Sequence, residues 1–187
     1  YDLNPGTFQP LGSKSLVKAD VLAPEQAFES AIYVGDRFDL SSNLSMDLGV
    51  RYSMYNYMGP QSVNLYAPNL PKSESNVIGT ASYKRGEMAK TYHGPELRMS
   101  ARYQLSEDFS VKAGYNTLRQ YIHLLTNTTA ISPTDIWKLS DPNIRPQYGD
   151  QTSLGFYKNF KDNTIETSIE GYYKNLKDYL DYKSGAN

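Results

Sequence analysis

The stretch that decides the fold reads LSMDLGVRYSMY, from Leu44 to Tyr55. Alternate residues in it differ in kind, because one set is apolar and the other is polar or glycine apart from Tyr55. The apolar set is Leu44, Met46, Leu48, Val50, Tyr52 and Met54, and the other set is Ser45, Asp47, Gly49, Arg51, Ser53 and Tyr55. A β-strand turns successive side chains to opposite faces, so this period of two predicts a strand with one apolar and one polar face.

Five other segments repeat the alternation. It is clearest at 97–105, 109–116 and 165–174, and weaker at 27–40 and 152–160. Each of these segments therefore predicts a further strand with unlike faces, which makes about six strands in all.

The connections between these segments alternate between short and long. The short ones are polar turns, Ser41-Ser42-Asn43, Ser106-Glu107-Asp108 and Lys161-Asp162-Asn163, whose residue types tolerate tight-turn geometry. They predict three β-hairpins, at about 26–57, 95–122 and 151–182. The long connections, at about 58–94 and 124–149, hold most of the prolines. Transmembrane barrels are laid out in this way, with short periplasmic turns and long extracellular loops.

Composition excludes several kinds of protein. With 19 Lys plus Arg against 20 Asp plus Glu, the chain offers no electrostatic case for binding nucleic acid. It has no cysteine, and its two histidines, His93 and His123, are 30 positions apart without a carboxylate pattern around them. We therefore expect no metal site, no cofactor and no enzyme activity. The 17 tyrosines favour, only slightly, a surface that meets both lipid and water.

Together these patterns predict an all-β fold: an antiparallel up-and-down transmembrane β-barrel segment, with its apolar face toward lipid and its polar face toward the lumen. A soluble all-β ligand-binding or adhesion module is the alternative, because a soluble sheet also alternates. Burial of Leu48, Val50, Met99 and Val111 against a second sheet would favour the module.

Several motifs resemble one family. Residues 94–103, followed by 111–116, resemble barrel hairpins of TonB-dependent outer-membrane receptors. Residues 119–125 and 132–137 are similar to a loop of those receptors that carry a carboxypeptidase-regulatory-like N-terminal extension. The resemblance continues through 143–151, which is similar to the start of the family's next strand, and through Tyr172-Tyr173-Lys174-Asn175. It covers most of 26–183 and is most distinctive between 119 and 151.

The resemblance implies a barrel of roughly 22 strands with a plugged lumen. Six strands cannot close such a barrel, so we expect the chain to be a segment of a larger receptor. That receptor would import a siderophore, cobalamin, glycan or peptide across the outer membrane of a Gram-negative cell. Its partners would be outer-membrane lipid, a plug domain and the TonB complex, reached through parts missing from this chain, and a surface lipoprotein is a candidate partner.

Two groups of side chains are candidates for function. Near the expected outer mouth, exposed aromatic rings beside a guanidinium suit stacking on a sugar or gripping a peptide. That first group is Arg119, Tyr121, His123 and Trp137, and simple packing of the loop base is the other reading of it. The second group comprises the lumen-facing charges Asp47, Arg51, Glu96, Arg98, Arg102 and Lys112. They would contact the plug or a polar solute, or else pair with opposite charges on neighbouring strands as a hydrated wall.

Overall fold

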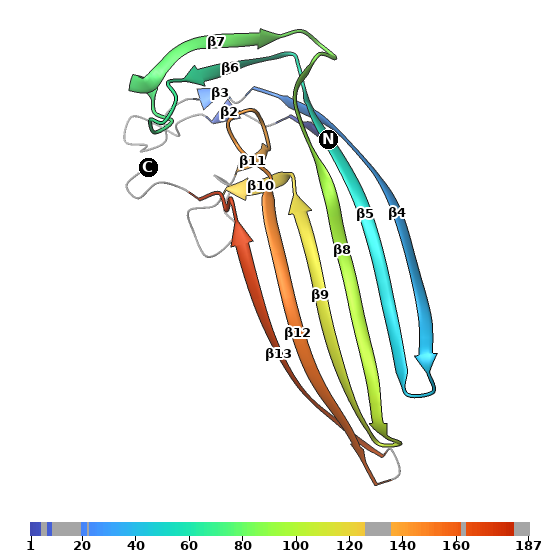
Figure 1. Cartoon of the computed structure of the whole chain (residues 1–187). Coiled ribbons are helices and arrows are strands. Elements are labelled where there is room, and N and C mark those ends of the chain that lie inside the picture. The colour runs from blue at the N-terminus through green and yellow to red at the C-terminus, as the bar shows by residue number, and fades with distance from the viewer. Residues whose placement is uncertain (5–6, 9–19, 22, 126–135, 162–163, 182–187) are drawn as a thin grey trace, which may run out of the picture.

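The protein consists of one long, curved antiparallel sheet with smaller hairpins gathered at one of its ends (Figure 1). The computed structural model describes residues 1–4, 7–8, 20–21, 23–125, 136–161 and 164–181. Seven strands form the sheet, in the order β1-β4-β5-β8-β9-β12-β13. Their bounds are Asp2–Leu3 (β1), Glu25–Ser41 (β4), Leu44–Met58 (β5), Met88–Ser106 (β8), Phe109–Gln120 (β9), Gln147–Phe160 (β12) and Ile165–Lys177 (β13).

The smaller elements lie at the end of the sheet opposite the tight turns (Figure 1). They are β6 and β7, which pair with each other, the similar pair β10 and β11, and the two-residue pair β2 and β3. Their bounds are Gln61–Tyr66 (β6), Val77–Tyr83 (β7), Ile122–Leu125 (β10), Ile136–Leu139 (β11), Thr7–Phe8 (β2) and Asp20–Val21 (β3). A short 3-10 helix, Glu74–Asn76, precedes β7. None of the described residues belongs to a helix that is long and apolar enough to cross a membrane.

The three hairpins of the long sheet are β4–β5, β8–β9 and β12–β13, and the register keeps like faces together. Val50 faces Val34 on one side and Leu97 on the other, whereas Arg51 faces Tyr33 and Glu96. Because directly opposed residues in an antiparallel pair point to the same side, the alternation within each strand becomes one apolar and one polar face across the whole sheet.

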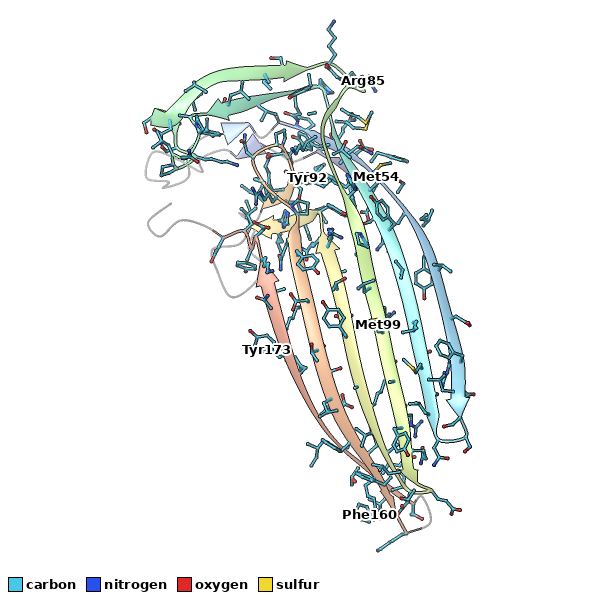
Figure 2. All side chains as sticks on the ribbon, viewed as in Figure 1. Met54, Arg85, Tyr92, Met99, Phe160 and Tyr173 are labelled. Carbon is cyan, nitrogen blue, oxygen red and sulfur yellow. The ribbon has the colours of Figure 1, made fainter. Side chains whose placement is uncertain are left out.

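The apolar face remains uncovered by the described part of the chain. Leu48 is 37% exposed, Val50 42% and Met99 38%, and Val111 is half-buried. Figure 2 shows side chains projecting from both faces of a single sheet, with Met99 near its middle. No second sheet among the described residues packs on this face, so they do not form the arrangement expected of a soluble sandwich. The prediction of an antiparallel barrel segment is confirmed.

The long connections carry more structure than their sequence suggested. Strand β8 begins at Met88 and not near residue 95, and β12 begins at Gln147 and not near 151. The segment 58–94 also holds the β6–β7 hairpin, and 124–149, of which 126–135 lie outside the described residues, holds half of β10 and all of β11. These polar segments lack the apolar alternation because they lie beyond the apolar part of the sheet, where pairing with β5 continues β8 and pairing with β9 continues β12.

The buried core lies on the polar side of the sheet, at the end that carries the small hairpins. Its members are Ala27, Tyr55, Tyr57, Val63, Tyr121 and Leu139. They come from β4, β5, β6, the β9–β10 junction and β11, so the core forms where the β10–β11 hairpin folds back onto the inner wall. Side chains gather densely around Tyr92 in this region (Figure 2).

Candidate functional site

The polar face of the sheet carries all six charged residues that the sequence placed there. Asp47 and Arg51 lie on β5, Glu96, Arg98 and Arg102 on β8, and Lys112 on β9. The register opposes Arg51 to Glu96, Asp47 to Ser100 and Arg102 to Lys112. The six therefore share one continuous surface, which is divided electrostatically into two parts.

The β4–β5 side of this surface is charge-compensated. Arg51 Nη2 lies 2.9 Å from Glu29 Oε1, and its Nη1 lies 3.8 Å from Glu96 Oε2. Glu96 also accepts a hydrogen bond from Ser53 Oγ at 2.6 Å. Lower on the wall, Asp47 lies 3.8 Å from Arg37. Opposite charges on neighbouring strands therefore hold this side of the wall together, as cross-strand pairs do.

The β8–β9 side is different. Among the residues that the structure describes, Arg98, Arg102 and Lys112 take part in no ion pair, and all three are exposed. Arg102 makes one side-chain hydrogen bond, from Nε to Ser110 Oγ at 3.3 Å. These cations therefore remain available to other groups.

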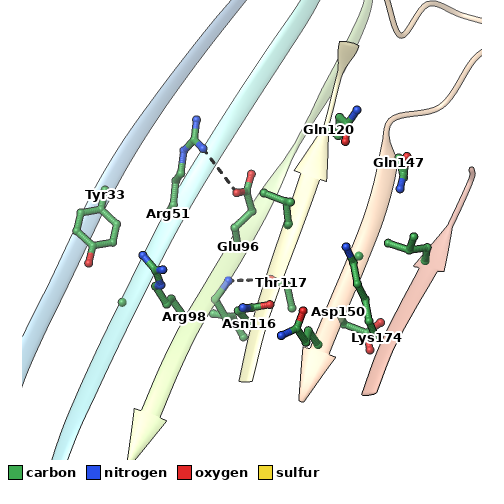
Figure 3. Close-up of a pocket in the computed structure, with 16 residues that line it drawn as sticks. Tyr33, Arg51, Glu96, Arg98, Asn116, Thr117, Gln120, Gln147, Asp150 and Lys174 are labelled. Atoms are coloured by element: carbon green, nitrogen blue, oxygen red, sulfur yellow. Dashed lines mark hydrogen bonds and ion pairs between the residues drawn. The ribbon is translucent and has the colours of Figure 1, made fainter. Parts of the chain in front are cut away.

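Two hollows open on this face. The upper one, of about 480 Å³, is shown in Figure 3, where Arg51 points toward Glu96 while Arg98 and Asn116 come from the next strands. The lower one, of about 700 Å³, lies over Gly49, Ser100 and Gly114. Because Tyr33, Gly49, Arg98 and Asn116 line both hollows, the two are adjacent along the wall.

Above the hollows, stacked tyrosines hold the β10–β11 hairpin against the wall. The rings of Tyr55 and Tyr121 lie 4.6 Å apart with an angle of 4° between their planes. Tyr55 donates a hydrogen bond to the Ser140 carbonyl at 2.8 Å, and the hydroxyls of Tyr121 and Ser53 are 2.8 Å apart. Tyr121 is only 3% exposed, and burial raises the pKa of its phenol above the ordinary value. Its ring is therefore part of the packing.

A buried ion cluster fixes the same hairpin to the start of β4. Lys138 on β11 forms ion pairs with Glu25 and, at 3.1 Å, with Asp141. Glu25 also accepts hydrogen bonds from the Leu139 amide at 3.0 Å and the Tyr57 hydroxyl at 3.1 Å. Burial alone would lower the pKa of the Lys138 amine, but Asp141 and Glu25 outweigh it and raise that pKa. Lys138 is therefore a charged, partly buried link between the β10–β11 hairpin and the long sheet.

His123 belongs to this packed layer as well. It is 3% exposed, and its Nε2 lies 3.0 Å from Ser140 Oγ. Burial lowers the pKa of the imidazole below its usual value, so the neutral form is favoured. No three His, Asp or Glu side chains of the described ranges come together as metal ligands.

Arg119 occupies a seam at the upper end of β8 and β9. The paired ladder of these strands starts at Arg98 and Asn116. Above it, side chains bond to the β8 backbone: Thr117 Oγ1 accepts from the Leu97 amide at 2.8 Å, and Arg119 Nη1 donates to the Pro95 carbonyl at 2.6 Å. The guanidinium also lies 5.3 Å from the Tyr148 ring. Arg119 therefore joins two strands where Pro95 has no amide to offer.

Trp137 is the exposed member of the predicted aromatic cluster. Its side chain is 53% exposed on β11. It borders a hollow of about 260 Å³ between β11 and β6, with Tyr66, Asn64 and Asn143 among the other lining residues. The Asn143 side-chain amide donates to the Asn64 carbonyl at 2.9 Å, which connects the two loop regions across this hollow.

Comparison with known proteins agrees with this architecture. The family model described as "TonB dependent receptor-like, beta-barrel" matches residues 2–187. The chain belongs to the TonB-dependent receptor β-barrel family. No curated protein and no solved structure matches the chain.

Membership of this family confirms the resemblance found in the motifs and establishes the general function of the chain. TonB-dependent receptor barrels are outer-membrane transport receptors and not enzymes, so this receptor barrel is a segment of such a transporter. Its curved antiparallel sheet is a segment of a transmembrane barrel. The family implies a plug and TonB as partners, although this chain shows neither.

The receptor barrel thus brings together only part of the expected mouth cluster. Tyr121 and His123 are buried beside the β10–β11 hairpin, and Arg119 lies between the upper ends of β8 and β9. Trp137 borders the outer hollow, which is the hollow of about 260 Å³ between β11 and β6. Reasoning from sequence missed Glu25, Lys138 and Ser140, which hold the loop hairpin down. A lysine in a polar loop resembles a solvated residue, and its pairing with Glu25, 113 positions away, cannot be predicted from the local sequence.

Proposed function

We propose that this segment forms part of the wall and the outer mouth of a Gram-negative receptor that imports a scarce nutrient. The nutrient is a siderophore, a cobalamin, a glycan or a peptide. Binding takes place outside, and passage follows when TonB displaces the plug. The plug and the TonB-binding segment belong to other parts of the receptor, and a surface lipoprotein is a further partner.

The observation that carries this proposal is the combination of a two-faced sheet with loops folded in at one end. The uncovered apolar face suits lipid, and the hydrated polar face suits a lumen wide enough for a nutrient. Short connections at one end, and long connections that carry the β6–β7 and β10–β11 hairpins at the other, fit periplasmic and extracellular ends, respectively. On this basis the segments 58–94 and 124–149 are the extracellular loops.

For the ligand we propose an order of contact among the four mouth residues. Trp137 touches the ligand directly, because its ring is exposed beside the outer hollow and aromatic rings bind sugar and peptide groups well. Arg119 contributes from the seam with its remaining N–H groups. Tyr121 and His123, which are buried, act by holding the β10–β11 hairpin that carries Trp137.

Uptake by cells that express the full-length receptor tests the proposal. Cells lacking the receptor, complemented with wild type, should accumulate one labelled member of the four nutrient classes, and only while TonB is present. Trp137→Ala should raise the concentration needed for half-maximal uptake, and Trp137→Phe should restore most of it. Tyr173→Phe on the lipid face is the matched control and should behave as wild type. If no class accumulates in a TonB-dependent way, the proposal is wrong.

A further inference from the structure

Two cations face each other directly on the lumen wall. Arg102 on β8 and Lys112 on β9 are partners in the ladder, so both side chains leave the same face from adjacent strands. Neighbouring strands lie about 4.8 Å apart, and like charges that are directly opposite destabilise a sheet. The rest of this wall avoids such pairs, as Arg51 with Glu96 and Arg37 with Asp47 show.

The nearest carboxylates on the wall do not relieve this repulsion by contact. Asp39 and Glu170 lie in the same row, each two strands from a cation, and the Glu170 side chain leans over Gly155, the residue opposite Lys112. Glu170 accepts a hydrogen bond from the Tyr157 hydroxyl at 2.8 Å. Asp47 pairs with Arg37 and accepts from Ser100 at 3.2 Å. Arg98 adds a third cation four residues from Arg102 on the same face.

Between these cations the wall is hollow. Ser100 and Gly114 face each other in the row between Arg98 and Arg102, and Gly49 lies on the adjacent strand. These small residues form the floor of the 700 Å³ hollow, while Arg98 and Lys112 stand at its rim and the ion-paired Arg37 and Asp47 line its β4–β5 side. A Cβ added at Gly114 would lie 2.8 Å from Ser153 Oγ, so the Ser153 hydroxyl lies over this glycine and is part of the floor. The floor and rim together form a cradle with donors on several sides.

We propose that Arg98, Arg102 and Lys112 bind carboxylate or phosphate groups of the imported solute, and that the cargo of this receptor is therefore anionic. This inference rests on the proposed import function and names its substrate class. Guanidinium groups hold carboxylates and phosphates through two parallel hydrogen bonds, and lysine adds a point charge. The lower hollow adjoins the 480 Å³ hollow, because Arg98 lines both. An anion that passes the β10–β11 hairpin into the upper hollow therefore reaches the cradle next.

Titration of citrate into the detergent-solubilised full-length receptor tests the inference. Citrate supplies three carboxylates and needs no knowledge of the natural cargo. Wild type should bind it saturably, and binding should weaken as NaCl rises from about 0.1 M to 1 M, where the Debye length falls from about 10 Å to 3 Å. The variant R98Q/K112Q should bind about tenfold or more weakly, because it lacks two charge-assisted donors.

The matched control is D108N/K158Q, which removes an ion pair at the tight-turn end of the sheet, outside both hollows, without changing the net charge. Its citrate affinity should equal that of wild type. Arg102→Gln alone should weaken binding and gives a second measurement if the double variant does not fold.

Equal affinity of wild type and R98Q/K112Q overturns the inference. So does the absence of citrate binding to wild type together with a lower Tm of R98Q/K112Q, since carboxylates of the receptor itself would then occupy the cradle. Citrate binding needs no TonB, so a failure of TonB-dependent uptake remains distinguishable from a failure here.

Discussion

Lys138→Met removes the cation that lies between Glu25 and Asp141 while keeping a long side chain in its place. Breaking a buried ion pair by removing one partner costs about 3–5 kcal/mol. The Lys138 side chain is 27% exposed and that of Glu25 is 10% exposed, and Glu25 keeps the Leu139 amide and the Tyr57 hydroxyl as donors. We therefore expect the low end, about 3 kcal/mol, which corresponds to a roughly 100-fold larger population of undocked hairpin.

Hydrogen–deuterium exchange of the full-length receptor measures this population. Amides of β10 and β11 should exchange about 100-fold faster in Lys138→Met, while those in the middle of β5 and β8 stay protected, because only the hairpin opens. Adding Glu25→Gln should restore part of the protection by removing the uncompensated carboxylate. Lys158→Met is the matched control, since Lys158 pairs with Asp108 at the opposite, exposed end of the sheet.

Unchanged exchange in β10–β11 would refute the reasoning, because the ion cluster would then not hold the hairpin. Equal acceleration in Lys158→Met would refute it as well, since the effect would follow from loss of any lysine. Failure of Glu25→Gln to slow exchange would show that the buried carboxylate is not what the lysine compensates.

Three further predictions concern other parts of the chain. Because burial lowers the pKa of His123, the undocked hairpin binds more protons than the docked one, so docking is fully stable above about pH 6.5 and weakens as the pH falls through the lowered pKa of the docked state. His123→Gln should reduce this pH dependence in hydrogen-exchange rates that are corrected for their intrinsic pH dependence. Equal pH dependence in wild type and variant would contradict the prediction. Gly94 has φ +155°, and a Cβ there would lie 2.7 Å from Arg119 Nη2. Gly94→Ala should therefore lower the free energy of unfolding by about 1–3 kcal/mol, measured by urea unfolding from lipid vesicles. An unchanged urea midpoint would contradict the role given to Gly94 and Arg119 in joining β8 and β9. Leu154→Arg on the lipid face should destabilise the folded receptor by about 2–4 kcal/mol in the same assay, whereas Gln151→Arg on the lumen face should cost far less; equal losses would reverse the assignment of faces.

Local pattern predicted the sheet because a strand's two faces depend on neighbours in sequence. Val50 and Arg51 show their opposite environments in the alternation of their own segment, and the tight turn at Ser42 and Asn43 follows from residue type. The ends of the strands were harder to predict from sequence. Strand β8 extends back to Met88 through polar residues whose pairing depends on β5 and not on their own pattern.

The site depended on longer distances. Sequence placed the six wall charges on one face, but the ion pairs of Arg51 and the unpaired opposition of Arg102 and Lys112 require the register between strands. Tyr121 and His123 look like exposed loop residues in isolation. Their burial follows from contacts with Ser53 and Ser140, which are 68 and 17 positions away.

The pairing of the long sheet has a consequence for the order in which the protein assembles. The two strands of each hairpin follow one another directly in the sequence, so the entropy lost in closing each hairpin turn is small. Docking of β10–β11 instead links Glu25 to Leu139, 114 positions apart, and needs β4, β5 and β8 already in place. The hairpins of the sheet therefore have a lower contact order than the inner layer, and we expect the most deeply buried residues of the chain to lose contact with water last.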